Sequence, residues 1–231
     1  MSKGIFVKNK GFTIIELMIA ISILSLLLFT GSYSYSLMSE RWNKELGQFS
    51  KSAQNAKQLE NLQRLIEGVQ SFIVVDTNQT PSFFFVGDNN SLLAVSRSGL
   101  FSGEFSEIFR LTTVAKESGK FDLVYQSSST EDVILIGTEQ SIEFTQKLTL
   151  FSNLDNISFR YLGWRHLHQK NALQKNPANH RWFERFSGID NQLMPEQVSI
   201  TLTKAAKELS FTVSLDSSTE KWMSPYIKWD G

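Results

Sequence analysis

The chain has 231 residues, with 23 basic and 23 acidic side chains, so its formal net charge is zero and one or two domains are expected. It contains no cysteine, which excludes disulfides, a thiolate nucleophile and every Cys-ligated metal centre. The balanced charge also argues against a nucleic-acid-binding protein, because such proteins usually carry a basic excess.

The N-terminal segment has the composition of a membrane anchor. Residues 1–11 contain three lysines and no acid, and the run from Phe12 to Phe29 is apolar apart from Thr13, Glu16, Ser22 and Ser25. As a helix this run would span about 27 Å, close to the thickness of a bilayer core. The lysines before it predict that the N-terminus lies on the cytoplasmic side.

A cleaved secretory signal peptide or an ordinary single-pass anchor would also produce an apolar run of this kind. Small residues follow Phe29, so a signal-peptidase site there agrees with the sequence. Glu16 argues against both alternatives, because a carboxylate inside an apolar segment costs about 2.5–3.5 kcal/mol on insertion. Such a residue indicates a partner within the membrane.

Residues 10–17 read Lys-Gly-Phe-Thr-Ile-Ile-Glu-Leu. This segment resembles the processing motif of type IV prepilins and type II secretion pseudopilins, in which a membrane peptidase cuts after the glycine and methylates the new N-terminus. The resemblance implies that residues 1–11 are a leader ending at Gly11, that Phe12 becomes the methylated first residue, and that Glu16 acts in assembly.

The chemistry of these residue types agrees with that assignment. Gly11 has no side chain to obstruct a protease, and cleavage after it leaves an amino group on Phe12. Glu16 lies about one helical turn farther on. Its carboxylate is therefore expected to neutralise that amine or the amine of a neighbouring subunit.

The segment after the membrane run is expected to continue as a helix. Apolar residues recur at helical spacing at Leu59, Leu62, Ile66, Val69 and Ile73, which predicts one apolar face. We divide the helix into a membrane and assembly part, 12–30, and an amphipathic part, 31–76. A bend is expected at Gly31. Docking on the chain's own sheet accounts for the stripe better than a coiled-coil dimer, because only two heptads are available.

Residues 77–231 are expected to form a β-rich globular domain, since most of the 18 phenylalanines lie in this part of the chain. Its short runs of Phe, Val and Ile are separated by turn residues. The predicted strands are 83–86, 92–95, 121–126, 133–136, 148–151, 157–164, 198–203 and 209–215. The last two alternate polar and apolar residues, which predicts a hairpin with one wet face and a turn at 204–208.

A long helix followed by antiparallel sheets is an α+β, pilin-like plan. Within the body, residues 156–162, Trp164, Trp182 and the Met-Pro-Glu-Gln-Val segment from Met194 resemble the J-type minor pseudopilin and the W-type minor pilin. Those families usually have leucine where this chain has Met194. The loop between Trp164 and Trp182 is also long and polar here.

Motifs for catalysis or metal binding are weak. His166, His168 and His180 share one polar loop, but their spacing fits no zinc motif, so a solvated surface is the better interpretation. No nucleophile elbow, phosphate loop or zinc-protease signature occurs in the sequence. We therefore expect no catalytic residue, no metal and no cofactor.

Several aromatic residues do not follow strand spacing. Trp164, Trp182 and Phe183 lie in or beside the polar loop, and Trp222 and Trp229 lie near the C-terminus. Two roles remain open for them, a lid on the core or a partner interface, because Trp, Tyr and Arg supply most interface hot spots.

The resemblance implies a non-enzymatic minor subunit placed near the tip of a type II secretion pseudopilus or a type IV pilus. Its partners would be other minor and major pilins or pseudopilins, the prepilin peptidase and the assembly platform of the inner membrane, but no nucleic acid. Its body would be periplasmic until assembly. The alternative is a single-pass anchored periplasmic binding or enzyme domain.

Overall fold

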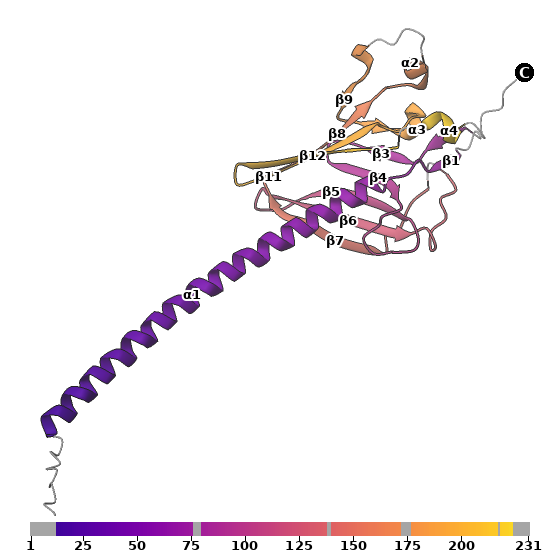
Figure 1. Cartoon of the computed structure of the whole chain (residues 1–231). Helices are drawn as coiled ribbons and strands as arrows, with labels where there is room; N and C mark the ends of the chain where they lie inside the picture. Colours follow the sequence, from indigo (N-terminus) through magenta and orange to yellow (C-terminus); the bar gives the residue numbers. More distant parts are fainter. Residues whose placement is uncertain (1–12, 76–79, 138–139, 172–176, 217, 224–231) are drawn as a thin grey trace, which may run out of the picture. The chain divides into compact units, whose positions relative to one another are not determined.

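A computed structural model describes residues 13–75, 80–137, 140–171, 177–216 and 218–223. By its internal contacts the chain divides into two compact units, Met1–Gln54 and Asn55–Gly231. Figure 1 shows a helix-rich N-terminal part and a body of antiparallel strands. This α+β, pilin-like architecture confirms the fold class that the sequence predicts.

The N-terminal helix α1 (Ile14–Glu67) runs without interruption through Gly31, so the helix has no break at that residue. It also ends earlier than Asp76. Its last turn closes with a hydrogen bond from Gly68 N–H to the Arg64 carbonyl, and Val69 then forms a bridge with Ser96 in the body. A Cβ on Gly68 would lie 2.5 Å from Oγ of Ser96, so this close passage requires glycine.

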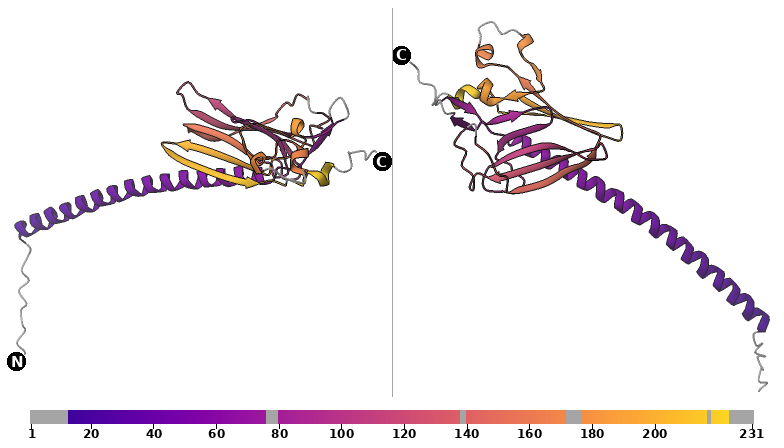
Figure 2. Two further views of the ribbon diagram at one scale, coloured as in Figure 1. Left: turned by 90° about the horizontal axis from the view of Figure 1, so that it is seen from above. Right: turned by 180° about the vertical axis from the view of Figure 1, so that it is seen from behind.

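Three antiparallel sheets make up the body (Figures 1 and 2). β1 (Ile73–Val75) and β2 (Pro81–Phe83) form a two-stranded sheet. The six-stranded sheet has the order β10-β3-β4-β5-β6-β7, with β3 (Phe85–Gly87), β4 (Ser91–Ser96), β5 (Glu107–Ala115), β6 (Phe121–Ser129), β7 (Gln146–Leu154) and β10 (Phe186–Ser187). The four-stranded sheet has the order β12-β11-β8-β9, with β8 (Asn156–Gly163), β9 (Arg181–Phe183), β11 (Gln197–Lys204) and β12 (Lys207–Ser214).

Short helices complete the fold, namely α2 (Leu167–Asn171), the 3-10 helix η1 (Pro177–Asn179), α3 (Gly188–Asn191) and α4 (Thr219–Met223). The predicted strands at 92–95, 121–126, 148–151, 157–164, 198–203 and 209–215 are confirmed, mostly with longer bounds. The predicted strand 83–86 is divided between β2 and β3, and β5 was not predicted.

The main core joins the end of α1 to both large sheets. Leu62, Leu65 and Ile66 are fully buried in one cluster with side chains of the six-stranded and four-stranded sheets. The Ser96 hydroxyl donates a hydrogen bond of 2.8 Å to the Leu65 carbonyl, which fastens the helix to β4. The amphipathic stripe therefore docks on the chain's own body, as predicted, and Val69 beyond the end of the helix belongs to the same core.

The opposite face of the six-stranded sheet has a smaller core. Val95 and Ile108 point to this face and are fully buried, and Leu135 from the following loop covers them. The prediction of a strand at 133–136 was wrong, because the backbone of this segment forms hydrogen bonds with the Gln140 side chain rather than with another strand. Gln140 donates to the Ile134 carbonyl and accepts from Ile136 N–H, both at 2.9 Å.

Candidate functional site

The N-terminal part of α1 exposes an unusually apolar surface. Within the segment Ile14–Trp42, the most apolar stretch of 18 residues has a mean hydropathy of 2.3, and none of that stretch is buried. Its large apolar side chains are exposed to between 41% and 81%. By length and composition this segment can cross a membrane, and its apolar surface requires lipid or other apolar helices around it.

Two hydroxyl groups within this segment are satisfied by the helix itself. The Ser22 hydroxyl donates to the Met18 carbonyl at 2.8 Å, and the Thr30 hydroxyl donates to the Leu26 carbonyl at 2.9 Å. Each bond removes the cost of placing an unpaired hydroxyl in hydrocarbon. These two polar residues are therefore compatible with a membrane-spanning helix.

Thr13 and Glu16 form a reciprocal capping box at the first turn of α1. The Thr13 N–H donates to Oε2 of Glu16 at 2.9 Å, and the Thr13 hydroxyl donates to the same oxygen at 3.0 Å. In return, Glu16 N–H donates to the Thr13 hydroxyl at 3.3 Å. The helix starts here because these bonds satisfy backbone donors that its first turn leaves without partners.

This arrangement leaves half of the carboxylate open. The bonds from Thr13 reach Oε2 of Glu16, whereas Oε1 accepts no hydrogen bond from the described part of the chain. Oε1 is therefore available to accept a hydrogen bond from an ammonium group that approaches the first turn. Gly11 and Phe12, the predicted processing residues, lie outside the described residues.

Thr13 is a functional residue that sequence reasoning missed. The signal was present, because Thr-x-x-Glu before an apolar run is a sequence signature of a helix N-terminus. The structure shows that Glu16 has a local role in starting the helix besides any role in assembly.

The predicted aromatic interface residues differ in burial. Trp164 is 8% exposed and belongs to the main core. Trp182 and Phe183 are half-buried on β9, where Arg160 lies over the Trp182 ring and Arg181 over the Phe183 ring. Trp222 is 44% exposed on α4, and Trp229 lies outside the described residues.

The His180 end of the loop that contains the histidines makes a polar contact with the body. His180 Nε2 lies 2.8 Å from Oε2 of Glu196, and the His180 ring packs on Trp164 with the ring centres 5.3 Å apart. Among the described residues, no group of three His, Cys, Asp or Glu side chains is arranged to hold a metal ion. His180 therefore contributes to the attachment of the loop.

Sequence reasoning also missed a pocket lined by Val69, Arg97 and Trp222, among others. Its walls come from the segment after α1, from the end of β4 and from the segment around α4. No local sequence signal brings these parts together, because they meet only in the folded body.

Comparison with known families agrees with the geometry of the N-terminus. Residues 7–31 match the prokaryotic N-terminal methylation motif, whereas no curated protein matches the chain. This motif is the one found in type IV prepilin-like proteins, so the match supports the prepilin and pseudopilin family. It implies processing by a prepilin peptidase, assembly with other pilins and the membrane anchoring typical of prepilins.

Proposed function

We propose that this chain is a non-enzymatic minor subunit of a type II secretion pseudopilus or a type IV pilus, assembled near the filament tip. The observation that carries the proposal is an apolar helix whose first turn, the first described turn after the predicted cleavage point in the sequence, leaves one carboxylate oxygen of Glu16 without a hydrogen bond from the described residues. The loose resemblance of residues 150–215 to the J-type minor pseudopilin and the W-type minor pilin supports the minor class.

The proposed pathway begins with the body in the periplasm and the N-terminus in the cytoplasm. Removal of residues 1–11 takes away three lysines and gives Phe12 a methylated amine. The helix then leaves the membrane and packs against the helices of neighbouring subunits. Oε1 of Glu16 accepts a hydrogen bond from the N-terminal amine of a neighbouring subunit, while Oε2 still accepts the hydrogen bonds from Thr13.

The exposed aromatic side chains of the body are suited to contacts with a partner protein. Trp182, Phe183 and Trp222 retain exposure in the isolated chain, whereas Trp164 is buried. An apolar groove offers a second surface, where Leu59 of α1 meets Phe151 of β7 and Leu209 of β12. A neighbouring subunit that covered this groove would remove apolar area from water.

The first test is the intact mass of the protein recovered from membranes of its host. We expect loss of residues 1–11 and the addition of one methyl group. Gly11→Leu should leave the full-length precursor. An unprocessed mass, or cleavage after Phe29, would contradict the proposal and favour an anchored or secreted domain.

The second test separates the assembly role of Glu16 from membrane insertion. Glu16→Ala should leave insertion intact and impair filament formation or secretion, because the neighbour's amine loses its acceptor. Glu40→Ala is the matched control, since it removes an exposed acid near the other end of the same apolar segment. Normal assembly in Glu16→Ala would remove the proposed role.

A further inference from the structure

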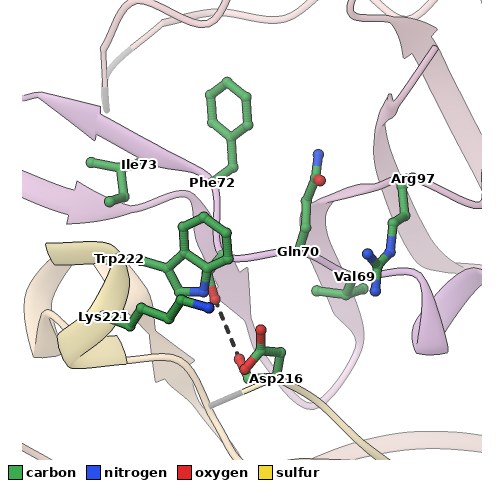
Figure 3. Close-up of a pocket in the computed structure, with 9 residues that line it drawn as sticks. Val69, Gln70, Phe72, Ile73, Arg97, Asp216, Lys221 and Trp222 are labelled. Atoms are coloured by element: carbon green, nitrogen blue, oxygen red, sulfur yellow. Dashed lines mark hydrogen bonds between the residues drawn. The ribbon is translucent and has the colours of Figure 1, made fainter. Parts of the chain in front are cut away.

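A pocket of about 670 Å³ lies in the body, beyond the end of α1 (Figure 3). The segment Val69–Ile73 forms one wall, Arg97 stands on one side, and Trp222 and Lys221 of α4 lie across from it. Phe72 and Ile73 give the pocket apolar surface. Two cations thus face an apolar space from opposite sides.

Neither Arg97 nor Lys221 takes part in an ion pair within 4.0 Å in the described part of the chain. Lys221 lies 5.5 Å from the ring centre of Trp222, and after the hydrogen bonds from Ser218 and Trp222 its charge also helps to lower the pKa of Asp216. The acid of the pocket, Asp216, is already hydrogen-bonded. Ser218 N–H donates to it at 3.1 Å, and this bond lowers the pKa of Asp216.

The pocket also borders the edge of β1 that faces away from β2. Among the described strands β1 pairs only with β2, and Phe84 N–H donates to the Phe72 carbonyl at 2.8 Å. Because the backbone groups of successive residues in an antiparallel strand point to opposite edges, those of Ile73 point away from β2. The N–H and carbonyl of Ile73 are therefore placed to pair with an added extended segment.

The wall that carries Arg97 is held in place by buried polar contacts. Arg97 N–H donates to the Gly68 carbonyl at 2.9 Å, and at the other end of the loop the Gln70 amide donates to the Ser106 hydroxyl at 3.1 Å. The loop between them is fixed by Glu107, which is 1% exposed and accepts the N–H of Phe101 at 2.8 Å. A fixed wall reduces the entropy lost on binding.

We infer that this pocket binds an extended, acidic segment of a partner polypeptide. A carboxylate of that segment lies between Arg97 and Lys221, its backbone pairs with Ile73, and an apolar side chain packs against Trp222. A polypeptide fits better than an inorganic anion, because only a polypeptide uses the strand edge and the aromatic wall together with the charges. The inference goes beyond filament assembly and does not depend on it.

The test uses the full chain purified in detergent and fluorescence anisotropy. The probe is a fluorescein-labelled, end-capped peptide of alternating valine and glutamate, compared with matched peptides in which glutamine or lysine replaces glutamate. We expect the glutamate peptide to bind most tightly. Raising the salt concentration from about 0.05 M to about 0.5 M should weaken its binding.

Two substitutions in the pocket test whether the peptide binds there. Arg97→Gln and Lys221→Gln should each weaken binding of the glutamate peptide by about two- to fivefold, as for exposed ion pairs. Both side chains are exposed, so the body should still fold. Arg185→Gln and Lys147→Gln remove exposed cations elsewhere and serve as matched controls.

A further peptide tests the strand edge. Methylation of its central backbone nitrogen removes one donor and should weaken binding if the segment pairs with Ile73. The inference is overturned by equal affinity for the three peptides, by no binding at about 1 mM peptide, or by unchanged affinity in both cation variants. None of these outcomes bears on prepilin processing, which the mass measurement tests separately.

Discussion

The backbone N–H of Thr13 donates a hydrogen bond of 2.9 Å to Oε2 of Glu16, and Glu16 N–H returns a bond of 3.3 Å to the Thr13 hydroxyl. The residue that the sequence marks for assembly therefore also starts its own helix. The capping bonds use Oε2, whereas the proposed assembly role uses Oε1. Changing Thr13 rather than Glu16 therefore tests the capping role by itself.

Thr13→Val should weaken the first turn of α1 without removing the acid. Loss of a side-chain cap costs about 0.5–2 kcal/mol, because Glu16 N–H loses the Thr13 hydroxyl as its acceptor. Amide hydrogen exchange of residues 14–17 in detergent micelles should become faster. Thr13→Ser, which keeps the hydroxyl, is the control. Equal exchange rates in Thr13→Val and the unmodified protein would contradict the capping role.

The second prediction concerns Glu107, a buried carboxylate in the main body. It accepts the N–H groups of Phe101 and Ser102 and the hydroxyl of Tyr125. Glu107→Ala should lower the free energy of unfolding of the body by about 3 kcal/mol, because these buried donors lose their acceptor. Urea unfolding followed by circular dichroism measures the change.

Glu104→Ala is the control for that experiment, since Glu104 is exposed in the same loop. Its effect should stay within about 0.5 kcal/mol. A similar loss of stability in the two variants would show that Glu107 does not hold the loop.

The third prediction is a loss of stability at high pH. Burial and the neighbouring Glu107 raise the pKa of Tyr125 well above its ordinary value, and burial and Asp88 raise the pKa of Tyr161. Above about pH 10 the unfolded chain loses these protons while the folded chain keeps them, so the free energy of unfolding falls as pH rises. Below about pH 10 this contribution is fully present.

Urea midpoints measured between about pH 9 and about pH 11 should show this decline. Tyr125→Phe should flatten it, because one of the two titrating groups is gone. The exposed Tyr35 provides the control, and Tyr35→Phe should leave the slope unchanged. An equal slope in Tyr125→Phe would mean that Tyr125 is not protected from ionisation in the folded state.

The elements that could be predicted from the sequence are those with a regular apolar period. β11 shows this most clearly, because alternate residues are buried along its length. β5 was missed since Glu107, Ile108 and Phe109 are all buried, so its start has no alternation. The segment at 133–136 has strand composition but no strand partner, and pairing depends on tertiary contacts that composition does not encode.

The candidate site divides in the same way. Glu16 was predictable because a carboxylate in an apolar run stands out locally, and Thr13 follows from its spacing to Glu16. The pocket of Arg97 and Trp222 was not predictable, since its walls lie far apart in the sequence and meet only after the sheets form. Burial of Trp164 likewise depends on how the polar loop packs on the body.

The last prediction concerns the turn between β11 and β12. Lys204 pairs with Lys207, so the turn consists of Ala205 and Ala206 alone, shorter than the predicted 204–208. Both alanines have positive φ, 50° and 62°. A two-residue turn with both φ values positive is type I′, which favours Asn-Gly, and a Cβ in this conformation costs about 1–2 kcal/mol.

Ala206→Gly should therefore raise the stability of the body by about 1 kcal/mol, which corresponds to about 2–4 °C in Tm for a domain of this size. Ala205→Asn should add to this gain while keeping the N–H that donates to Asp155 at 2.6 Å. Ala115→Gly, at the end of β5 and outside the positive-φ residues, should lower Tm instead. If Ala206→Gly also lowered Tm, the turn would not hold the alanines in the left-handed region, and the register of the hairpin would have to differ from Lys204 opposite Lys207.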